Sequence, residues 1–175
     1  MTTTITGATG VSQVQAGAIE HGDLPSGSVI QVVNFQTGAV ATGTGAIPLD
    51  DTIPQNTEGS EYMTLAITPV SATSKLRIDT TCVVSYSTAA IVMMCLFQDT
   101  TANALATNWV RVSSGSYQRQ IVSSYIMTAG TTSETTFKVR LGGNGSGTTT
   151  FNGYGGASKL GGTLASSIII TEYTP

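Results

Sequence analysis

Charged residues are scarce in this sequence. Asp, Glu, Lys and Arg make up 10% of its 175 residues, against about 25% in an ordinary soluble domain. The seven Lys and Arg residues are scattered singly, so no basic stripe exists that could neutralise a nucleic-acid backbone. We therefore expect no nucleic-acid partner. Because Thr, Ser, Asn and Gly must cover much of the surface, the composition is also unusual for a free monomer.

Histidine and cysteine are nearly absent, which restricts both catalysis and metal binding. The single histidine, His21, lies in a turn-like stretch, where a Ser-His-Asp or Cys-His catalytic group would be poorly positioned. One histidine and two cysteines supply no tetrahedral zinc ligand set with a familiar spacing. We expect a non-enzymatic protein with no metal and no cofactor.

The two cysteines, Cys82 and Cys95, lie on neighbouring apolar runs. A hairpin turning at residues 87–90 would place them opposite each other on one face of a sheet, where a disulfide could form. Free cysteine is among the most buried residue types. Buried free thiols are therefore the favoured interpretation.

Long apolar runs are absent as well. No window approaches the roughly 18 apolar residues of a membrane-spanning helix. Met1 is followed by three threonines rather than by the basic and then apolar residues of a signal peptide. We expect no membrane insertion and no export by that route.

What the sequence does contain is threonine, a β-branched residue that suits strands. From Pro25 onward, short apolar or alternating runs recur between clusters of Gly, Ser, Asn and Pro. This pattern predicts an all-β sandwich of about eight short strands. The expected strands span residues 28–35, 62–68, 75–86, 91–99, 108–113, 118–127, 134–141 and 166–173.

Two of these runs, 91–97 (IVMMCLF) and 167–170 (SIII), are apolar on both faces. A sandwich strand that faces water on one side should alternate instead. An interface between subunits would cover the outer side, and a long loop folded over the sheet is the alternative. The expected interface residues are Ile91, Met93, Met94, Leu96, Ile168, Ile169 and Ile170.

The first 26 residues differ from the rest, because they carry only a few spaced apolar side chains, such as Val11, Val14 and Ile19. These are too few to bury a core. We expect residues 1–26 to be an arm that docks on neighbouring subunits or on another protein, and residues 27–175 to be a β-sandwich knob.

Acidic side chains cluster in one loop, at Asp50, Asp51, Glu58 and Glu61. They could gather oxygen ligands for a hard cation or serve as a glycosidase pair, but a solvated acidic turn is the favoured interpretation. The stretch 142–147 (GGNGSG) lacks the lysine of a phosphate-binding loop and is predicted to be a flexible turn.

Ordered blocks spread along residues 27–175 resemble a domain of bacteriophage and prophage tail-fibre-like virion proteins. The resemblance is carried by GSVIQVV (27–33), the segment 42–79 around AIPLDDTIPQNTEGSEYMTLAITP, CLFQDTTANALA (95–106), IMTAGTTSETTFKVR (126–140), TTTFNG (148–153) and SSIIITEY (166–173).

This resemblance implies a jelly roll of the tumour-necrosis-factor-like type that assembles as a homotrimer. It implies a virion structural protein, assembled in the bacterial cytoplasm, that forms a short tail fibre or baseplate-appendage knob contributing to host attachment. A trimeric capsid decoration, or cement, protein is the alternative, and a glycan depolymerase is a remote one. If the knob binds a host surface glycan, exposed aromatic side chains could stack on sugar rings; the candidates are Trp109, Tyr117 and Tyr154.

Overall fold

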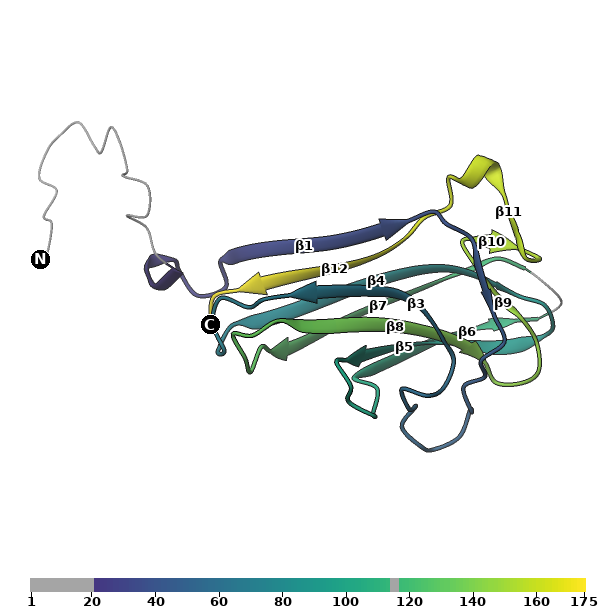
Figure 1. Cartoon of the computed structure of the whole chain (residues 1–175), viewed down its shortest axis with the longest axis horizontal. Helices are drawn as coiled ribbons and strands as arrows, with labels where there is room; N and C mark the ends of the chain where they lie inside the picture. Colours follow the sequence, from purple (N-terminus) through teal and green to yellow (C-terminus); the bar gives the residue numbers. More distant parts are fainter. Residues whose placement is uncertain (1–20, 114–116) are drawn as a thin grey trace, which may run out of the picture.

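The computed structural model describes residues 21–113 and 117–175, in which strands are the main regular structure (Figure 1). The helical elements of the described chain are two short 3-10 turns, η1 (His21–Asp23) and η2 (Leu160–Gly162). In this part of the chain no helix has the length and apolar character needed to cross a membrane. The strands are β1 (Val29–Thr37), β2 (Ala41–Gly43), β3 (Ser60–Ile67), β4 (Lys75–Tyr86), β5 (Ala90–Gln98), β6 (Ala106–Val112), β7 (Arg119–Thr128), β8 (Thr135–Gly143), β9 (Thr149–Phe151), β10 (Gly153–Tyr154), β11 (Ala157–Ser158) and β12 (Ser166–Tyr173).

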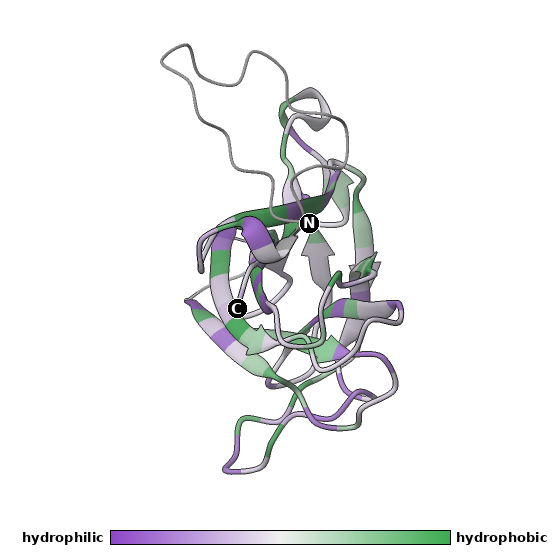
Figure 2. Ribbon diagram, turned by 90° about the vertical axis from the view of Figure 1, so that its left-hand side faces the viewer, coloured by the Kyte–Doolittle hydropathy of each residue, from purple (hydrophilic) through white to green (hydrophobic). Residues whose placement is uncertain are grey.

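The long strands form two antiparallel sheets that face each other (Figures 1 and 2). The first sheet has the order β1-β12-β4-β7, and the short strands β9 and β2 continue it beyond the end of β12. The second sheet has the order β3-β8-β5-β6. Chain order and sheet order together give the two Greek keys of a jelly roll. The prediction of an all-β jelly-roll sandwich is therefore confirmed.

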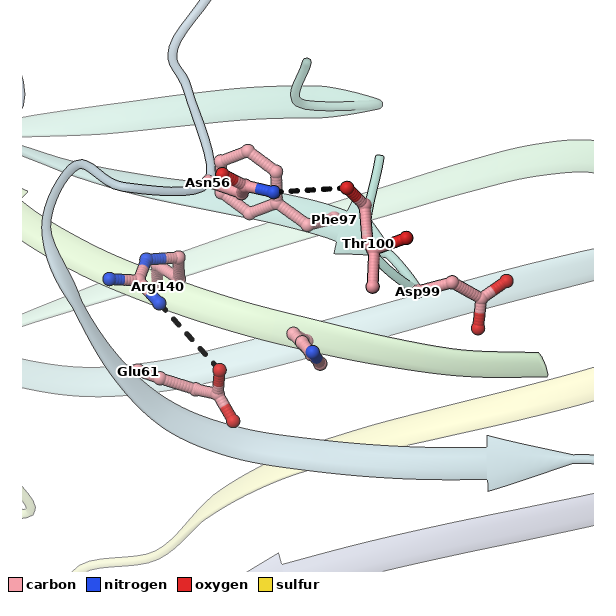
Figure 3. A pocket seen from close by; sticks show the side chains of 7 residues that line it. Asn56, Glu61, Phe97, Asp99, Thr100 and Arg140 are labelled. Carbon is pink, nitrogen blue, oxygen red and sulfur yellow. Dashed lines mark hydrogen bonds and ion pairs between the residues drawn. The ribbon is translucent and has the colours of Figure 1, made fainter. Parts of the chain in front are cut away.

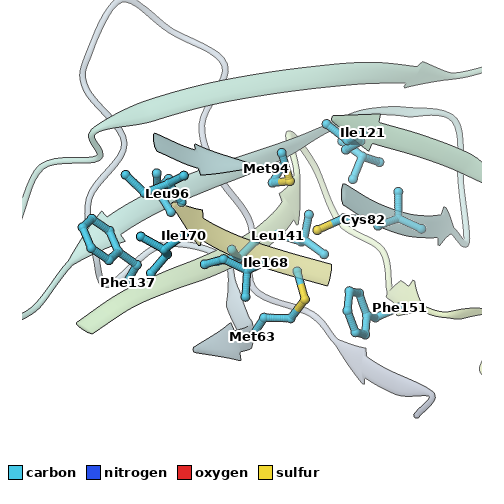
Figure 4. Close-up of a cluster of buried hydrophobic side chains, with 14 of the residues drawn as sticks. Met63, Cys82, Met94, Leu96, Ile121, Phe137, Leu141, Phe151, Ile168 and Ile170 are labelled. Atoms are coloured by element: carbon cyan, nitrogen blue, oxygen red, sulfur yellow. The ribbon is translucent and has the colours of Figure 1, made fainter. Parts of the chain in front are cut away.

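The core lies between the two sheets and follows from the alternation of the strands. In β4, Leu76 and Ile78 point inward and are fully buried, whereas Lys75 and Arg77 point outward. Each such buried aliphatic side chain stabilises the fold by about 1.5 to 3 kcal/mol relative to exposure. Both sheets contribute to this cluster, and Figure 4 shows Met63, Cys82, Met94, Leu96, Ile121, Phe137, Leu141, Phe151, Ile168 and Ile170 within it.

A second, smaller apolar cluster lies on the outer side of β5. Met93, Cys95 and Phe97 point away from the main core and pack with Ile47, which comes from the loop 44–59. The Ile47 amide donates a hydrogen bond to the Gly143 carbonyl at 3.0 Å, which fixes the loop to the end of β8. The chain's own loop therefore covers the outer face of β5.

This loop corrects the predicted subunit interface. Met94, Leu96, Ile168 and Ile170 lie in the main core, and Met93 lies beneath the loop, so none of the five is available to another subunit. The alternative of a loop folded over the sheet is the correct one at β5. Of the seven predicted residues, Ile91 is half-buried and Ile169 is exposed.

The predicted hairpin between the two cysteine-bearing strands is also wrong. β4 belongs to the first sheet and β5 to the second, so residues 87–89 cross between sheets rather than turn within one. Cys82 lies in the main core and Cys95 lies in the outer cluster beneath the loop. Both are free and buried, which confirms the prediction of buried thiols.

All eight predicted strands are present, and the sequence pattern missed the short strands β2, β9, β10 and β11. The predicted glycine turn is wrong at its first two residues, because Gly142 and Gly143 are buried at the end of β8. A Cβ at Gly143 would overlap the ring of Tyr86, so only glycine fits there. The predicted arm residues Val11, Val14 and Ile19 lie outside the described residues.

Candidate functional site

The outer face of the first sheet carries exposed apolar side chains that no described loop covers. Antiparallel registers place Val32, Thr171, Arg77 and Ile126 side by side in one row across β1, β12, β4 and β7. Val32, Val122, Ile126 and Ile169 are exposed by 52%, 54%, 63% and 36%. We call these four residues the apolar sheet face. Exposed apolar groups on one broad face are typical of a contact surface for another protein.

The charges on this face are engaged with their neighbours. Arg77 Nε lies 2.9 Å from Asp79 Oδ2, and this carboxylate raises the pKa of Arg77 further. Lys75 Nζ donates a hydrogen bond to Thr128 Oγ1 at 2.8 Å. Both surface contacts are exposed and contribute little to stability. Their effect is that the face presents mainly apolar and neutral polar groups, which favours an equally neutral partner surface.

The strand β7 lies at the edge of the first sheet and pairs only with β4 among the described strands. Its edge is linked to the second sheet by Asn108 of β6, whose Nδ2 donates a hydrogen bond to the Val122 carbonyl at 2.6 Å. Val122 and Ile126 therefore project from a strand that is held at both sheets. The apolar sheet face is built on regular strands and is rigid rather than a loop surface.

Of the predicted interface residues, only Ile169 belongs to the apolar sheet face. Ile91 lies on the other sheet and lines a small pocket with Arg111 and Asn144. The other three residues of this face, Val32, Val122 and Ile126, were not predicted from the sequence. A signal was present, because adjacent apolar pairs such as Ile121-Val122 and Ile126-Met127 supply one side chain to each face of a strand.

The end of the sandwich opposite the C-terminus is built from loops and short strands (Figure 1). Here the β10-β11 hairpin carries Tyr154, whose ring lies 5.7 Å from Lys159 Nζ. A shallow pocket of about 250 Å³ beside it is lined by Ser87, Thr148, Thr150 and two glycines. This end offers hydroxyl groups and an exposed aromatic ring to a ligand.

The three aromatic residues predicted to contact glycan are all exposed, but they come from different parts of the fold. Trp109 is in β6 opposite Met93, on the outer face of the second sheet. Tyr117 lies between β6 and β7, and Tyr154 lies in the β10-β11 hairpin. They are no single stacking surface, and glycan contact stays a prediction.

The carboxylates of Asp50 and Glu58 in the acidic loop are engaged in separate local hydrogen bonds. Asp50 Oδ1 accepts a hydrogen bond from the Thr52 amide at 2.8 Å, and the Thr52 hydroxyl and amide lower the pKa of Asp50. Glu58 accepts a hydrogen bond from the Gln55 amide at 2.9 Å. Among the described residues, no three His, Cys, Asp or Glu side chains gather as metal ligands would. The interpretation of a solvated turn therefore fits Asp50.

A polar pocket of about 220 Å³ opens on the outer face of the second sheet (Figure 3). It lies between the covering loop and the strands β5 and β8. Arg140 Nε donates a hydrogen bond to the Glu58 carbonyl at 2.7 Å, and Nη2 donates one to the Gly59 carbonyl at 2.8 Å. The third nitrogen, Nη1, lies 3.6 Å from Glu61 Oε2. The pocket is lined by Asn56, Glu61, Phe97, Asp99, Thr100, Lys138 and Arg140.

Comparisons with known proteins give only distant similarities. No family model and no curated protein matches the chain. Similar solved structures include dimeric latent PorU from Porphyromonas gingivalis, with a TM-score of 0.39 and 9% identity over 86% of this chain and 14% of that one. Infectious bursal disease virus Gx strain gives a TM-score of 0.37 and 9% identity, covering 82% of this chain and 36% of that one.

A third similar structure is the enzymatically active domain of tailspike protein 4 from Bacteriophage CBA120. It gives a TM-score of 0.30 and 13% identity, covering 81% of this chain and 19% of that one. The chain therefore spans well under two thirds of the length of each of these structures. Similarities this low assign no family to the chain.

Proposed function

We propose that this chain is a non-enzymatic structural protein of a bacteriophage virion. In this proposal it forms a homotrimeric knob on a short tail fibre or baseplate appendage and contributes to host-surface binding. The observation that carries the proposal is the apolar sheet face, which leaves Val122 and Ile126 more than half exposed in a chain with 10% charged residues. A face of this kind is stable in water when a partner covers it.

The jelly-roll topology supports the proposal, since virus capsid domains are among the proteins that use this fold. The sequence blocks that resemble phage tail-fibre-like proteins also fall on its main elements. Residues 126–140 form the end of β7, its turn and the start of β8, and residues 148–153 include β9. The resemblance therefore follows the strands and turns of the sandwich rather than one isolated loop.

The two ends of the sandwich suit different roles. The chain enters β1 beside its own C-terminus, where the Gly27 amide donates a hydrogen bond to the Thr174 carbonyl at 3.2 Å. The Thr174 hydroxyl donates another to the Pro25 carbonyl at 2.7 Å. Attachment to the virion through residues 1–26 would therefore leave the loop end, with Tyr154, pointing outward to the host.

Labelling of purified virions tests this proposal. Antibodies against the folded chain should decorate the tail in electron micrographs, and the purified protein should compete with adsorption of the phage to host cells. Decoration of the head, together with normal adsorption in the presence of excess protein, would favour the capsid decoration role instead. Absence of the chain from purified virions would contradict both.

A further inference from the structure

The polar pocket on the second sheet contains polar groups that are not used by the fold (Figure 3). Lys138 is half-buried in β8, between Thr64 of β3 and Phe97 of β5 in the ladder. Within residues 21–113 and 117–175, its ammonium group makes no hydrogen bond and no ion pair. An ammonium group has three N–H donors, so one that the fold does not use and that lines a pocket is a candidate ligand-binding group.

Asn56 supplies a hydrogen-bond acceptor to the same pocket. Its side-chain Nδ2 donates to the carbonyls of Thr100 and Thr101, both at 3.2 Å, which fixes the orientation of the amide. The Asn56 backbone amide donates to the Ala102 carbonyl at 2.8 Å. Its Oδ1 is therefore a positioned acceptor. The hydroxyl of Thr100, which also lines the pocket, can both donate and accept.

The walls of the pocket are fixed before any ligand arrives. Arg140 ties the covering loop to β8 through the carbonyls of Glu58 and Gly59. Asp99 accepts hydrogen bonds from the Thr136 amide at 2.7 Å and from the Thr135 hydroxyl at 2.9 Å. Pockets with positioned polar groups lose little entropy on binding.

The charges of the pocket indicate the class of ligand. Two cations, Lys138 and Arg140, stand with two carboxylates, Glu61 and Asp99, so the lining is formally neutral. An anion such as phosphate would meet the two carboxylates, and a cation would meet the two basic groups. Donors and acceptors placed side by side instead match neighbouring hydroxyl groups, each of which donates and accepts.

We propose that this pocket binds a neutral sugar residue through Lys138, Asn56 and Thr100. A volume of about 220 Å³ is below the range of pockets for larger ligands, roughly 300 to 1,000 Å³, and suits a single ring of a longer glycan. The inference deepens the proposed function, and it rests on that function for the host origin of the glycan. It places the sugar contact away from Tyr154 and the loop end.

The test is a titration of the full-length, isotope-labelled protein with D-glucose, D-galactose, D-mannose and N-acetylglucosamine, followed by amide NMR shifts. Glucuronate and inorganic phosphate are titrated in parallel as anionic probes. At least one neutral sugar should shift the amides of residues 56, 100 and 138 in a saturable manner. Lys138→Gln should weaken that binding by about tenfold or more, because a charged donor is lost.

Lys159→Gln is the matched control, since it removes the same charge from an exposed position next to Tyr154. It should leave sugar binding unchanged, and both variants should keep the amide spectrum of the folded chain. Asn56→Ala gives a second variant within the pocket and should also weaken binding.

Three results would overturn the inference. The first is that no neutral sugar shifts the pocket amides. The second is that Lys138→Gln and Asn56→Ala bind as tightly as the unaltered chain, and the third is that only glucuronate or phosphate binds. Because purified protein is used, these results are independent of whether virion labelling places the chain on the tail.

Discussion

Glu172 of β12 accepts a hydrogen bond from Gln31 Nε2 of the neighbouring strand β1 at 2.5 Å. Glu172 is fully buried, and its carboxylate also accepts hydrogen bonds from the backbone amides of Val70 and Ser71, at 2.9 and 3.3 Å. It therefore joins the first sheet to the loop that follows β3. Burial raises the pKa of Glu172, but the hydrogen bonds from Gln31, Val70 and Ser71 outweigh it and hold the pKa below its ordinary value.

Replacing this carboxylate should destabilise the fold. Glu172→Gln puts an NH₂ group where an oxygen now accepts amide hydrogen bonds, and leaves a buried donor unsatisfied. We expect a loss of about 2 kcal/mol in the free energy of unfolding, measured by urea denaturation at pH 7. Glu134→Gln, at an exposed turn position, is the control and should change stability little. Equal stability of both variants would contradict the role given to Glu172.

The same carboxylate should make stability depend on pH. Because the pKa of Glu172 is lower in the folded chain than in the unfolded chain, its contribution is present above the unfolded pKa. It is lost as the pH falls through the folded pKa. Melting temperatures should therefore fall on acidification more steeply in the unaltered chain than in Glu172→Gln. Parallel curves for the two proteins would contradict this.

The buried thiols should be unreactive in the native protein. Burial raises the pKa of Cys82 to about 12 and that of Cys95 to about 11, so neither forms the reactive thiolate near neutral pH. A maleimide reagent should label neither cysteine in the native chain and both after denaturation. If mild oxidation joined Cys82 to Cys95 in a disulfide, seen by mass spectrometry as the loss of two hydrogen atoms, the two strands would have to be arranged differently.

The loop that covers β5 should contribute to the core. Ile47 is almost fully buried against Met93 and Phe97, whereas Leu49 in the same loop is 52% exposed. Ile47→Ala should lower the free energy of unfolding by about 2 to 4 kcal/mol, and Leu49→Ala should change it little. Thermal melts of the two variants provide the comparison. A small effect at Ile47 would mean that the loop does not seal β5.

The strand pattern made much of the fold predictable. β4 and β12 have the predicted bounds, because alternating or continuous apolar runs end there at clear turn signals. Which strands pair with β4 and β12 was harder to predict from the sequence. The 12-residue alternation of β4 is compatible with a hairpin to β5, and only the crossing at residues 87–89 sends the two cysteines to separate clusters.

The candidate surfaces were harder to predict for a physical reason. The run 91–97 is apolar on both faces because the chain's own loop covers it, through Ile47, which lies more than forty residues away in the sequence. The exposed residue Ile126 instead lies in a strand whose apolar pairs are interrupted by Ser123 and Ser124, so the strand does not form a continuous apolar run. The local sequence pattern indicates that both faces of a strand are buried. It does not indicate which residues cover them.

The apolar sheet face should respond to one added charge. Ile126→Lys places a cation in the middle of a contact that excludes water, which should weaken association about a hundredfold or more. Thr64→Lys adds the same charge to an exposed position on the opposite sheet and should leave association unchanged. Sedimentation of both variants over a range of concentrations gives the comparison.

The native mass of the purified chain shows whether the apolar sheet face joins three copies. We expect a single species with three times the 18.0 kDa mass of one chain, and conversion of that species to single chains by Ile126→Lys. A well-folded species of 18.0 kDa at high concentration, with Val122 and Ile126 open to solvent, would contradict it.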